Sequence, residues 1–251
     1  DGRVLVTQTG SLVRLALAAN RGEMVSRWGH ILLRRALISR LDNPRNMSPQ
    51  EFLALRVSLL VRMGEADAAR AILQDIDIIN YTPDLANITV DVYANSADFT
   101  GACPVIATNS VAQDNAQWNA LKAICTAFRG DSAASIAQLD RYRTRGTMPR
   151  IDLLLAQKYA GAAGRSRRAT TIEWNGVKDM TPWRFGLTNA VGLTPPADVM
   201  KSASARYDSL AALSPMVGLT RRAAAADRAA AAGVLSSAAM VDLYGQLFAE
   251  P

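Results

Sequence analysis

The chain has 251 residues, of which 49% are hydrophobic and 20% are charged, and its formal net charge is +6. These values are ordinary for a folded protein and exclude disorder along most of the length. No apolar run reaches the roughly 20 residues that a membrane-spanning helix needs, so no transmembrane segment is expected. The chain begins at Asp1 without a signal-peptide pattern, which indicates a processed or trimmed piece of a longer protein.

Apolar residues at helical spacing predict two helices near the start, over residues 11–20 and 23–41. The second helix is apolar on more than one side, and its apolar residues are Met24, Val25, Trp28, Ile31, Leu32, Leu33, Leu37 and Ile38. A helix of that kind has to be packed from two directions, so we expect neighbouring helices to cover it.

A helical hairpin is predicted next, over residues 48–76. Ser48, Pro49 and Glu51 form a capping box with proline in the first helical turn. Gly64 is placed to end the first helix in the left-handed conformation, and a second helix starts almost at once. So short a loop forces the two helices into an antiparallel pair.

The same hairpin pattern recurs twice at a step of 33 residues, because Gly64-Glu65 is followed by Ala97-Asp98 and Gly130-Asp131 at corresponding positions. Small and larger apolar positions behind the turns also correspond; they are Ala69, Ala102 and Ser135, and Leu73, Ile106 and Leu139. One hairpin cannot bury both of its faces, whereas stacked hairpins bury a continuous core. The sequence therefore predicts an array of three hairpins.

This period and pattern resemble the tetratricopeptide repeat family over roughly residues 48–146. The most specific part is Gly64-Glu65 followed by Ala69 and Leu73, which is similar to that family's loop glycine, small second-helix residue and larger packing residue. The resemblance implies a right-handed solenoid that binds proteins or peptides along its concave surface. The alternative is that helical hairpins of similar length recur by chance.

After residue 146 the pattern becomes irregular. Helices are predicted over 149–160 and 182–192, and a turn at Asn175-Gly176 lies between them. Three Ala-rich helices are predicted over residues 197–249.

The predicted fold class is all-α. We expect an α-α superhelix of antiparallel hairpins over residues 1–160, and a Trp-containing segment with a less regular helical bundle packed on it over residues 161–251.

Cys103 and Cys125 are the two cysteines of the chain. They are too few for a disulfide scaffold and fit neither a zinc site nor a CxxC redox motif. In the repeat interpretation they lie on antiparallel neighbouring helices at similar height. A disulfide between them is one prediction and two buried free thiols are the alternative. A disulfide would indicate an oxidising compartment such as the periplasm.

No arrangement of residues predicts catalysis, and no cofactor or metal site is predicted. His30 is the single histidine, and Arg27 and Arg34, rather than a carboxylate, lie one turn away from it. A catalytic triad needs that carboxylate, so we expect a structural role for His30. Glu173 lies beside Trp174, whose ring would raise the pKa of the carboxyl group, but no partner acid for acid–base work is evident.

Two groups of residues are candidates for contact with a partner. The first group is Trp174, Trp183, Arg184 and Phe185. It is a candidate because tryptophan and arginine dominate binding hot spots. The alternative is that this group forms a core that closes the array. The second group is a basic loop cluster of Arg165, Arg167 and Arg168, which is too short to indicate nucleic-acid binding by itself.

These features predict a non-enzymatic protein–protein interaction scaffold, expected to be a subunit of a larger bacterial envelope assembly in the periplasm. A cytoplasmic location is the alternative. Other protein subunits are the expected partners, and nucleic acid is not expected as a partner. Acidic lipid and peptidoglycan stay open as alternative partners. Two further functions stay open. One is the non-catalytic helical arm of a cell-wall lytic enzyme, and the other is an anion-binding module that uses the 24 arginines, against 4 lysines.

Overall fold

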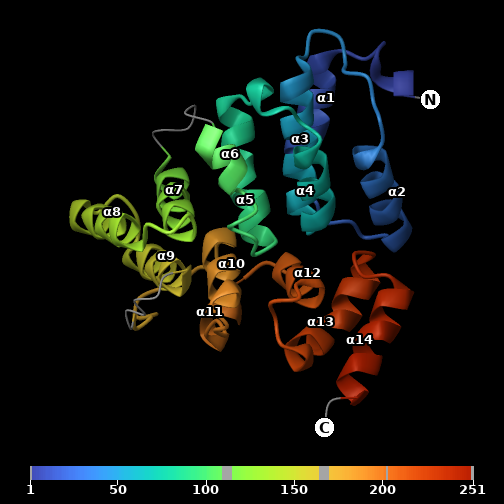
Figure 1. Cartoon of the computed structure of the whole chain (residues 1–251). Coiled ribbons are helices and arrows are strands. Elements are labelled where there is room, and N and C mark those ends of the chain that lie inside the picture. Colours follow the sequence, from blue (N-terminus) through green and yellow to red (C-terminus); the bar gives the residue numbers. More distant parts are fainter. Residues whose placement is uncertain (1, 109–114, 164–169, 202, 250–251) are drawn as a thin grey trace. The chain divides into compact units, whose positions relative to one another are not determined.

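Figure 1 shows the computed structural model, which describes residues 2–108, 115–163, 170–201 and 203–249. Within these ranges the chain forms fourteen α-helices, two short 3-10 helices and no β-strand. The predicted all-α fold class is therefore confirmed. None of the helices in the described ranges combines the length and the apolar character needed to span a bilayer.

Residue contacts divide the chain into two compact units, which are described separately. Unit 1 contains residues 1–88 and 204–251, and unit 2 contains residues 89–203. This division differs from the boundary expected near residue 160, because the last three helices of the chain belong to the same unit as the first four.

Unit 1 is built from seven α-helices and two 3-10 helices among its described residues. They are η1 (Gly2–Leu5), α1 (Gly10–Ala19), α2 (Arg27–Ile38), α3 (Pro49–Arg62), α4 (Ala66–Gln74), η2 (Ile78–Asn80), α12 (Arg206–Leu213), α13 (Leu219–Ala232) and α14 (Ser237–Ala249). Helix α3 packs against α1, α2 and α4, while α13 packs against α12, α14 and α2. Helix α5 (Pro83–Asn95) begins in unit 1 and ends in unit 2.

The hairpin of α3 and α4 forms as the capping signals predicted. The Ser48 hydroxyl accepts a hydrogen bond from the backbone N–H of Glu51 at 3.1 Å, and Pro49 occupies the first turn of α3. Gly64 follows with a φ of +82°, so the chain reverses where the sequence placed the turn.

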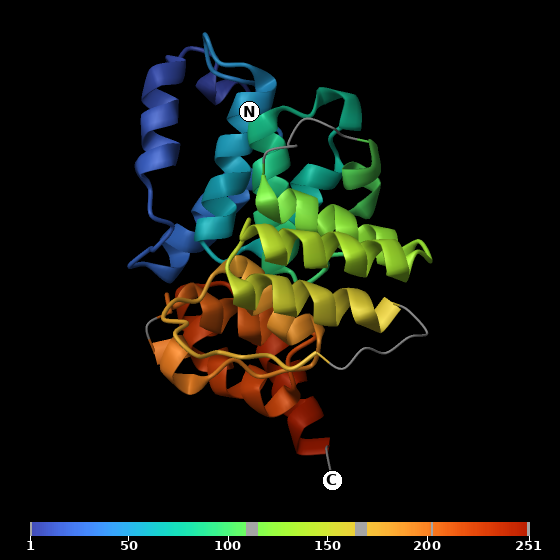
Figure 2. The same ribbon diagram turned by 90° about the vertical axis from the view of Figure 1, so that its left-hand side faces the viewer.

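Unit 2 contains the remaining helices, which are α6 (Cys103–Thr108), α7 (Ala116–Phe128), α8 (Ser132–Arg145), α9 (Arg150–Ala163), α10 (Pro182–Ala190) and α11 (Ala197–Lys201). Helices α7, α8 and α9 pack against one another and lie side by side in Figure 2. Helix α10 packs on α9 and α6 packs on α7. The sequence did not predict the short α11 as a helix separate from α12.

Three turns at the 33-residue step share one backbone geometry. Gly64, Ala97 and Gly130 have φ values of +82°, +54° and +105°. In each turn two successive N–H groups bond back to carbonyls three and five residues earlier, as in Gly64 to Val61 and Glu65 to Leu60. This pair of bonds is the Schellman pattern that ends a helix. The predicted turns at these positions are therefore present.

Aromatic rings form the core of unit 2. Phe99 meets Trp183 edge-on at a ring-centroid distance of 5.4 Å and lies 5.6 Å from the ring of Tyr159. Gly186 of α10 lies against the carbonyl of Ala94, where a Cβ atom would clash with the oxygen. The absent side chain lets α10 approach the end of α5 closely.

Candidate functional site

An apolar groove of about 330 Å³ lies in unit 1 between α1, α2 and α3. Its accessible lining is apolar and includes Leu12, Ala16 and Leu17 of α1, Leu33 and Ala36 of α2, and Phe52 of α3. Leu12 and Ala16 are exposed, so the groove is open to solvent along α1.

One wall of the groove is α1, which is fixed on α3 at both ends. Near its start, Val13 packs with Met47 and Phe52 in a small buried cluster. At its end, Arg62 donates hydrogen bonds to the carbonyls of Leu17 at 2.6 Å and Asn20 at 2.9 Å. These carbonyls belong to the unsatisfied last turn of a helix, so the guanidinium acts as the C-terminal cap of α1.

The opposite wall is α2, which a second arginine of α3 fixes in the same way. Arg56 donates to the carbonyls of Leu37 and Ser39, and its guanidinium lies 5.3 Å from the ring centroid of Phe52. Arg56 is buried, and this burial lowers the pKa of its guanidinium. Because both walls are fixed through α3, the groove between them is part of the folded structure of unit 1.

An exposed ion pair adds a further link between α1 and α3. Arg14 Nε lies 2.5 Å from Glu51 Oε1, and this hydrogen bond lowers the pKa of Glu51. We therefore expect Glu51 to titrate below the usual glutamate range in the wild type, and at the ordinary value in the variant Arg14→Gln. The pair contributes stability above the unfolded pKa of glutamate and loses it as the pH falls through the lowered folded value.

Side-chain carboxyl NMR across a pH titration measures this effect. A pKa for Glu51 that is the same in the wild type and in Arg14→Gln would show that the pair does not form in solution.

Helix α2 contacts α3, α4 and α13, as expected of a helix with several neighbours, but its outer face is exposed. Trp28 is 73% exposed and Leu32 is 63% exposed, whereas His30 and Leu37 are buried. The contacts with α3, α4 and α13 leave the face that carries Trp28 and Leu32 open to solvent.

His30 has a partner that the sequence did not indicate. Its Nε2 lies 2.8 Å from Oε1 of Glu65, and both side chains are buried. Arg34 Nη1 lies 3.5 Å from the other oxygen of Glu65. The three side chains join α2 to Glu65, the residue just before α4, so a carboxylate that the sequence did not place beside His30 is present there.

The predicted partner-binding residues of α10 are buried in unit 2. Trp183 and Phe185 are each 1% exposed and Arg184 is 6% exposed. Of the two interpretations of this segment, the burial of these three residues supports the core and not the exposed anchor. Their side chains form the core of unit 2, because Trp183 packs against Phe99 and its ring N–H donates to the carbonyl of Asp152 at 3.2 Å.

Arg184 forms a buried ion pair instead of a surface contact. Its Nε and Nη2 atoms lie 2.7 and 3.3 Å from the two carboxylate oxygens of Asp152. Its Nη1 donates to the backbone carbonyl and the carboxylate of Asp179 at 3.0 and 2.6 Å. Burial raises the pKa of Asp152, and the hydrogen bond and positive charge of Arg184 oppose this rise. Arg184 thus joins α9 to the segment before α10.

A polar hollow of about 230 Å³ lies beside this ion pair, and its walls include Arg150, Glu173 and Asp179. Arg150 Nη2 lies 3.0 Å from Glu173 Oε2, and both side chains are exposed, so Glu173 does not lie in an apolar environment. Trp174 is half-buried. The remaining predicted partner-binding residues, Arg165, Arg167 and Arg168, lie outside the described residues.

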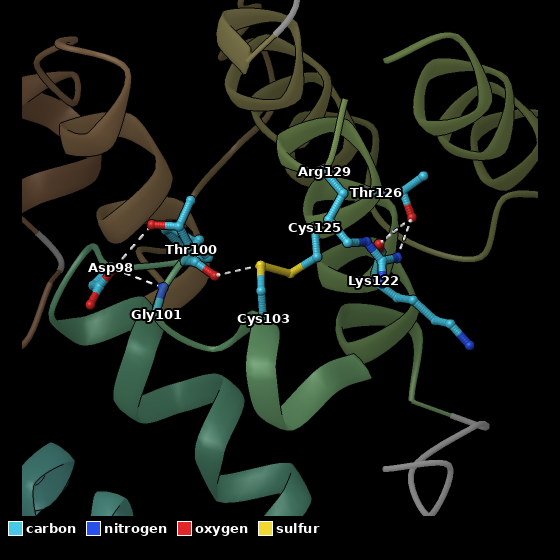
Figure 3. Close-up of a disulfide and its surroundings, with 9 residues drawn as sticks. Asp98, Thr100, Gly101, Cys103, Lys122, Cys125, Thr126 and Arg129 are labelled. Carbon is cyan, nitrogen blue, oxygen red and sulfur yellow. Dashed lines mark hydrogen bonds between the residues drawn. A yellow bond between two sulfur atoms is a disulfide. The ribbon is translucent and has the colours of Figure 1, made fainter. Parts of the chain in front are cut away.

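Cys103 and Cys125 are joined by a disulfide, shown in Figure 3. Their Cα atoms are 5.5 Å apart, and the bond connects the first residue of α6 to α7. Cys125 is buried and Cys103 is half-buried. Of the two sequence interpretations, the structure therefore supports the disulfide and not the two buried free thiols.

Sequence patterns did not indicate the role of the two arginines of α3, of which Arg56 lines the groove and Arg62 caps the α1 wall. A signal existed, because each arginine lies between two apolar residues in the sequence, and arginines that are buried or partly buried need partners. Their partners, however, are backbone carbonyls, which no sequence pattern identifies.

The described residues contain no group of three or more histidine, cysteine or acidic side chains that could hold a metal ion. Comparisons with family models, with curated proteins and with solved structures find no match to this chain.

Proposed function

We propose that the chain is a non-enzymatic protein–protein interaction module, and that the groove between α1, α2 and α3 binds an apolar helical segment of a partner protein. The groove carries this proposal, because it is open to solvent, wholly apolar in its accessible lining and fixed in shape by Arg56 and Arg62.

The size of the groove fits side chains rather than a large ligand. Its volume of about 330 Å³ is at the lower end of the ~300–1,000 Å³ range typical of small-molecule pockets. An amphipathic helix inserts anchors one turn apart into such a groove. Two leucine-sized anchors would contribute roughly 3–6 kcal/mol from apolar burial.

The wider architecture that we propose is a stack of hairpins similar to tetratricopeptide repeats. Its support is the Schellman geometry shared by the turns at Gly64, Ala97 and Gly130. The small residues five positions after these turns, Ala69, Ala102 and Ser135, are fully buried. The corresponding position behind each of the three turns is therefore a small, buried residue.

We propose that the module works in an oxidising compartment, as part of an assembly of the bacterial cell envelope. The support is the disulfide of Cys103 and Cys125, because such bonds persist in oxidising environments and are rare in the cytosol.

Partner capture with two matched variants tests the groove. Ala16→Glu places a carboxylate in the groove, and Leu15→Glu places one on an exposed position of the same helix that does not line it. Both variants change the net charge equally. A captured partner is identified by mass spectrometry, and its binding segment is then titrated against the purified chain.

We expect Ala16→Glu to weaken that binding by at least about tenfold, because an apolar anchor cannot compensate a desolvated carboxylate. Leu15→Glu should bind like the wild type. Equal binding by both variants, or an interaction that involves only unit 2, would contradict the proposal.

A further inference from the structure

The outer face of α2 combines exposed apolar side chains with arginine. Trp28, Leu32 and Arg35 follow one another at spacings of four and three residues, so they share one face of the helix. Trp28 and Leu32 are 73% and 63% exposed, and Val25, just before the helix, is fully exposed. Leu37, which lines the groove, lies on the opposite face of α2.

The chain is basic between Glu23 and Asp42, the acidic residues that flank α2 in the sequence. Residues 24–41 contain four arginines, Arg27, Arg34, Arg35 and Arg40, and no acidic residue. Arg27, Arg35 and Arg40 are exposed, while Arg34 lies near Glu65. Across residues 1–45 the chain has eight arginines and three acidic residues, which accounts for five of the six net positive charges.

This combination matches a lipid surface better than a protein surface. Tryptophan and arginine are also enriched at protein interfaces, so these residue types alone do not distinguish the two surfaces. The distinguishing feature is the run of exposed arginines from Arg27 to Arg40 without an acidic residue between them, which gives the continuous positive charge that anionic headgroups attract. Anionic headgroups and acyl chains meet within a few ångströms at a membrane surface, where tryptophan is enriched and arginine binds phosphate.

We propose that α2 is a membrane-docking element, in which Trp28 and Leu32 enter the interfacial region and Arg27, Arg35 and Arg40 bind the headgroups of anionic lipids. The helix lies in the plane of the surface and does not cross it. This docking uses a different face of α2 from the groove, so it does not depend on the proposed partner binding.

Vesicle flotation with the purified chain tests the proposal. One set of vesicles contains phosphatidylcholine alone and the other contains equal parts of phosphatidylcholine and phosphatidylglycerol. We expect binding to the anionic vesicles, weak binding to the neutral ones, and a steep loss as salt is raised, because the attraction is screened.

Three variants locate the surface. Trp28→Ser with Leu32→Ser removes the apolar contacts and should weaken partitioning by at least about tenfold. Arg35→Gln with Arg40→Gln should weaken it about 25-fold, since each arginine near an anionic surface contributes roughly fivefold. Phe248→Ser is the matched control, because Phe248 is 93% exposed on α14, which carries no arginine, and it should bind like the wild type.

Circular dichroism spectra that match the wild type would show that each variant is folded. The proposal is overturned if the chain does not bind anionic vesicles at low salt, or if it binds neutral vesicles as strongly as anionic ones. It is also overturned if the variant with Trp28→Ser and Leu32→Ser binds anionic vesicles like the wild type. It is also overturned if soluble poly(glutamate) binds through Trp28 while vesicles do not, because the surface would then recognise an acidic protein.

Discussion

Replacing Arg184 by methionine should lower the free energy of unfolding by about 3–5 kcal/mol, the largest effect that we expect from a single substitution. The change leaves the carboxylate of Asp152 buried without its bidentate partner, and an unpaired buried charge is strongly destabilising. Urea unfolding followed by tryptophan fluorescence measures the effect, because Trp118, Trp174 and Trp183 all lie in unit 2.

Two controls separate the buried pair from general surface effects. The double variant Arg184→Met with Asp152→Asn should recover part of the lost stability, since no buried charge is then left unpaired and the carboxylate of Asp179 is exposed. Arg150→Met breaks the exposed pair with Glu173 and should cost less than about 1 kcal/mol. A loss in Arg184→Met no larger than that of Arg150→Met would show that the buried pair does not hold unit 2 together.

The effect of Arg184→Met should depend on pH. Burial raises the folded pKa of Asp152, and loss of the arginine raises it further, because the opposing positive charge is gone. The folded variant therefore takes up a proton at a higher pH than the folded wild type. The destabilisation relative to the wild type is largest at neutral pH and shrinks as the pH falls through these raised values.

Reduction of the disulfide should lower the free energy of unfolding by about 3 kcal/mol. The bond joins residues separated by 22 positions. Opening a loop of this size lowers the free energy of unfolding by a few kcal/mol, largely because the unfolded chain gains conformational freedom. Wild-type protein with and without reductant is the preferred comparison, because both sulfur atoms remain in place.

Hydrogen exchange would show where the disulfide acts. Helix α6 has only six residues and is attached to α7 through Cys103, so its amides should lose protection first on reduction. A uniform loss across unit 2, or unchanged stability, would contradict this expectation. Thiol titration in denaturant without reductant should find no free thiol in protein taken from an oxidising compartment.

Local signals along the sequence predicted the helices well. Ser48 caps α3 and Gly64 ends it, and the turns at Ala97 and Gly130 repeat that geometry. These features depend on residues close together in the chain, for which capping and turn preferences are strong. The start of α2 was less well predicted, because Ser26 caps the helix three residues after the expected start.

Contacts between distant residues were not predictable in the same way. Asp152 and Arg184 are 32 positions apart, and His30 and Glu65 are 35 apart, so no spacing rule connects them. Trp183 and Arg184 are the residue types that dominate binding hot spots, yet they are buried. Composition cannot separate a buried arginine that meets a carboxylate from an exposed one that meets a partner.

The groove itself arises from long-range contacts. Arg56 and Arg62 bind the last carbonyls of α2 and α1, which lie up to 45 positions earlier in the sequence. Periodicity alone predicted two helices there, and it indicated that the second, over residues 23–41, would be covered by its neighbours. The structure leaves the groove and the outer face of α2 open instead.

Site-specific photo-crosslinking in the cells that make this protein tests the proposed groove most directly. A benzophenone side chain is introduced at position 16, inside the groove, and at position 15, outside it. We predict one discrete protein adduct from position 16 that is absent from position 15. Adducts that are the same at both positions, or none at position 16, would contradict a partner bound in the groove.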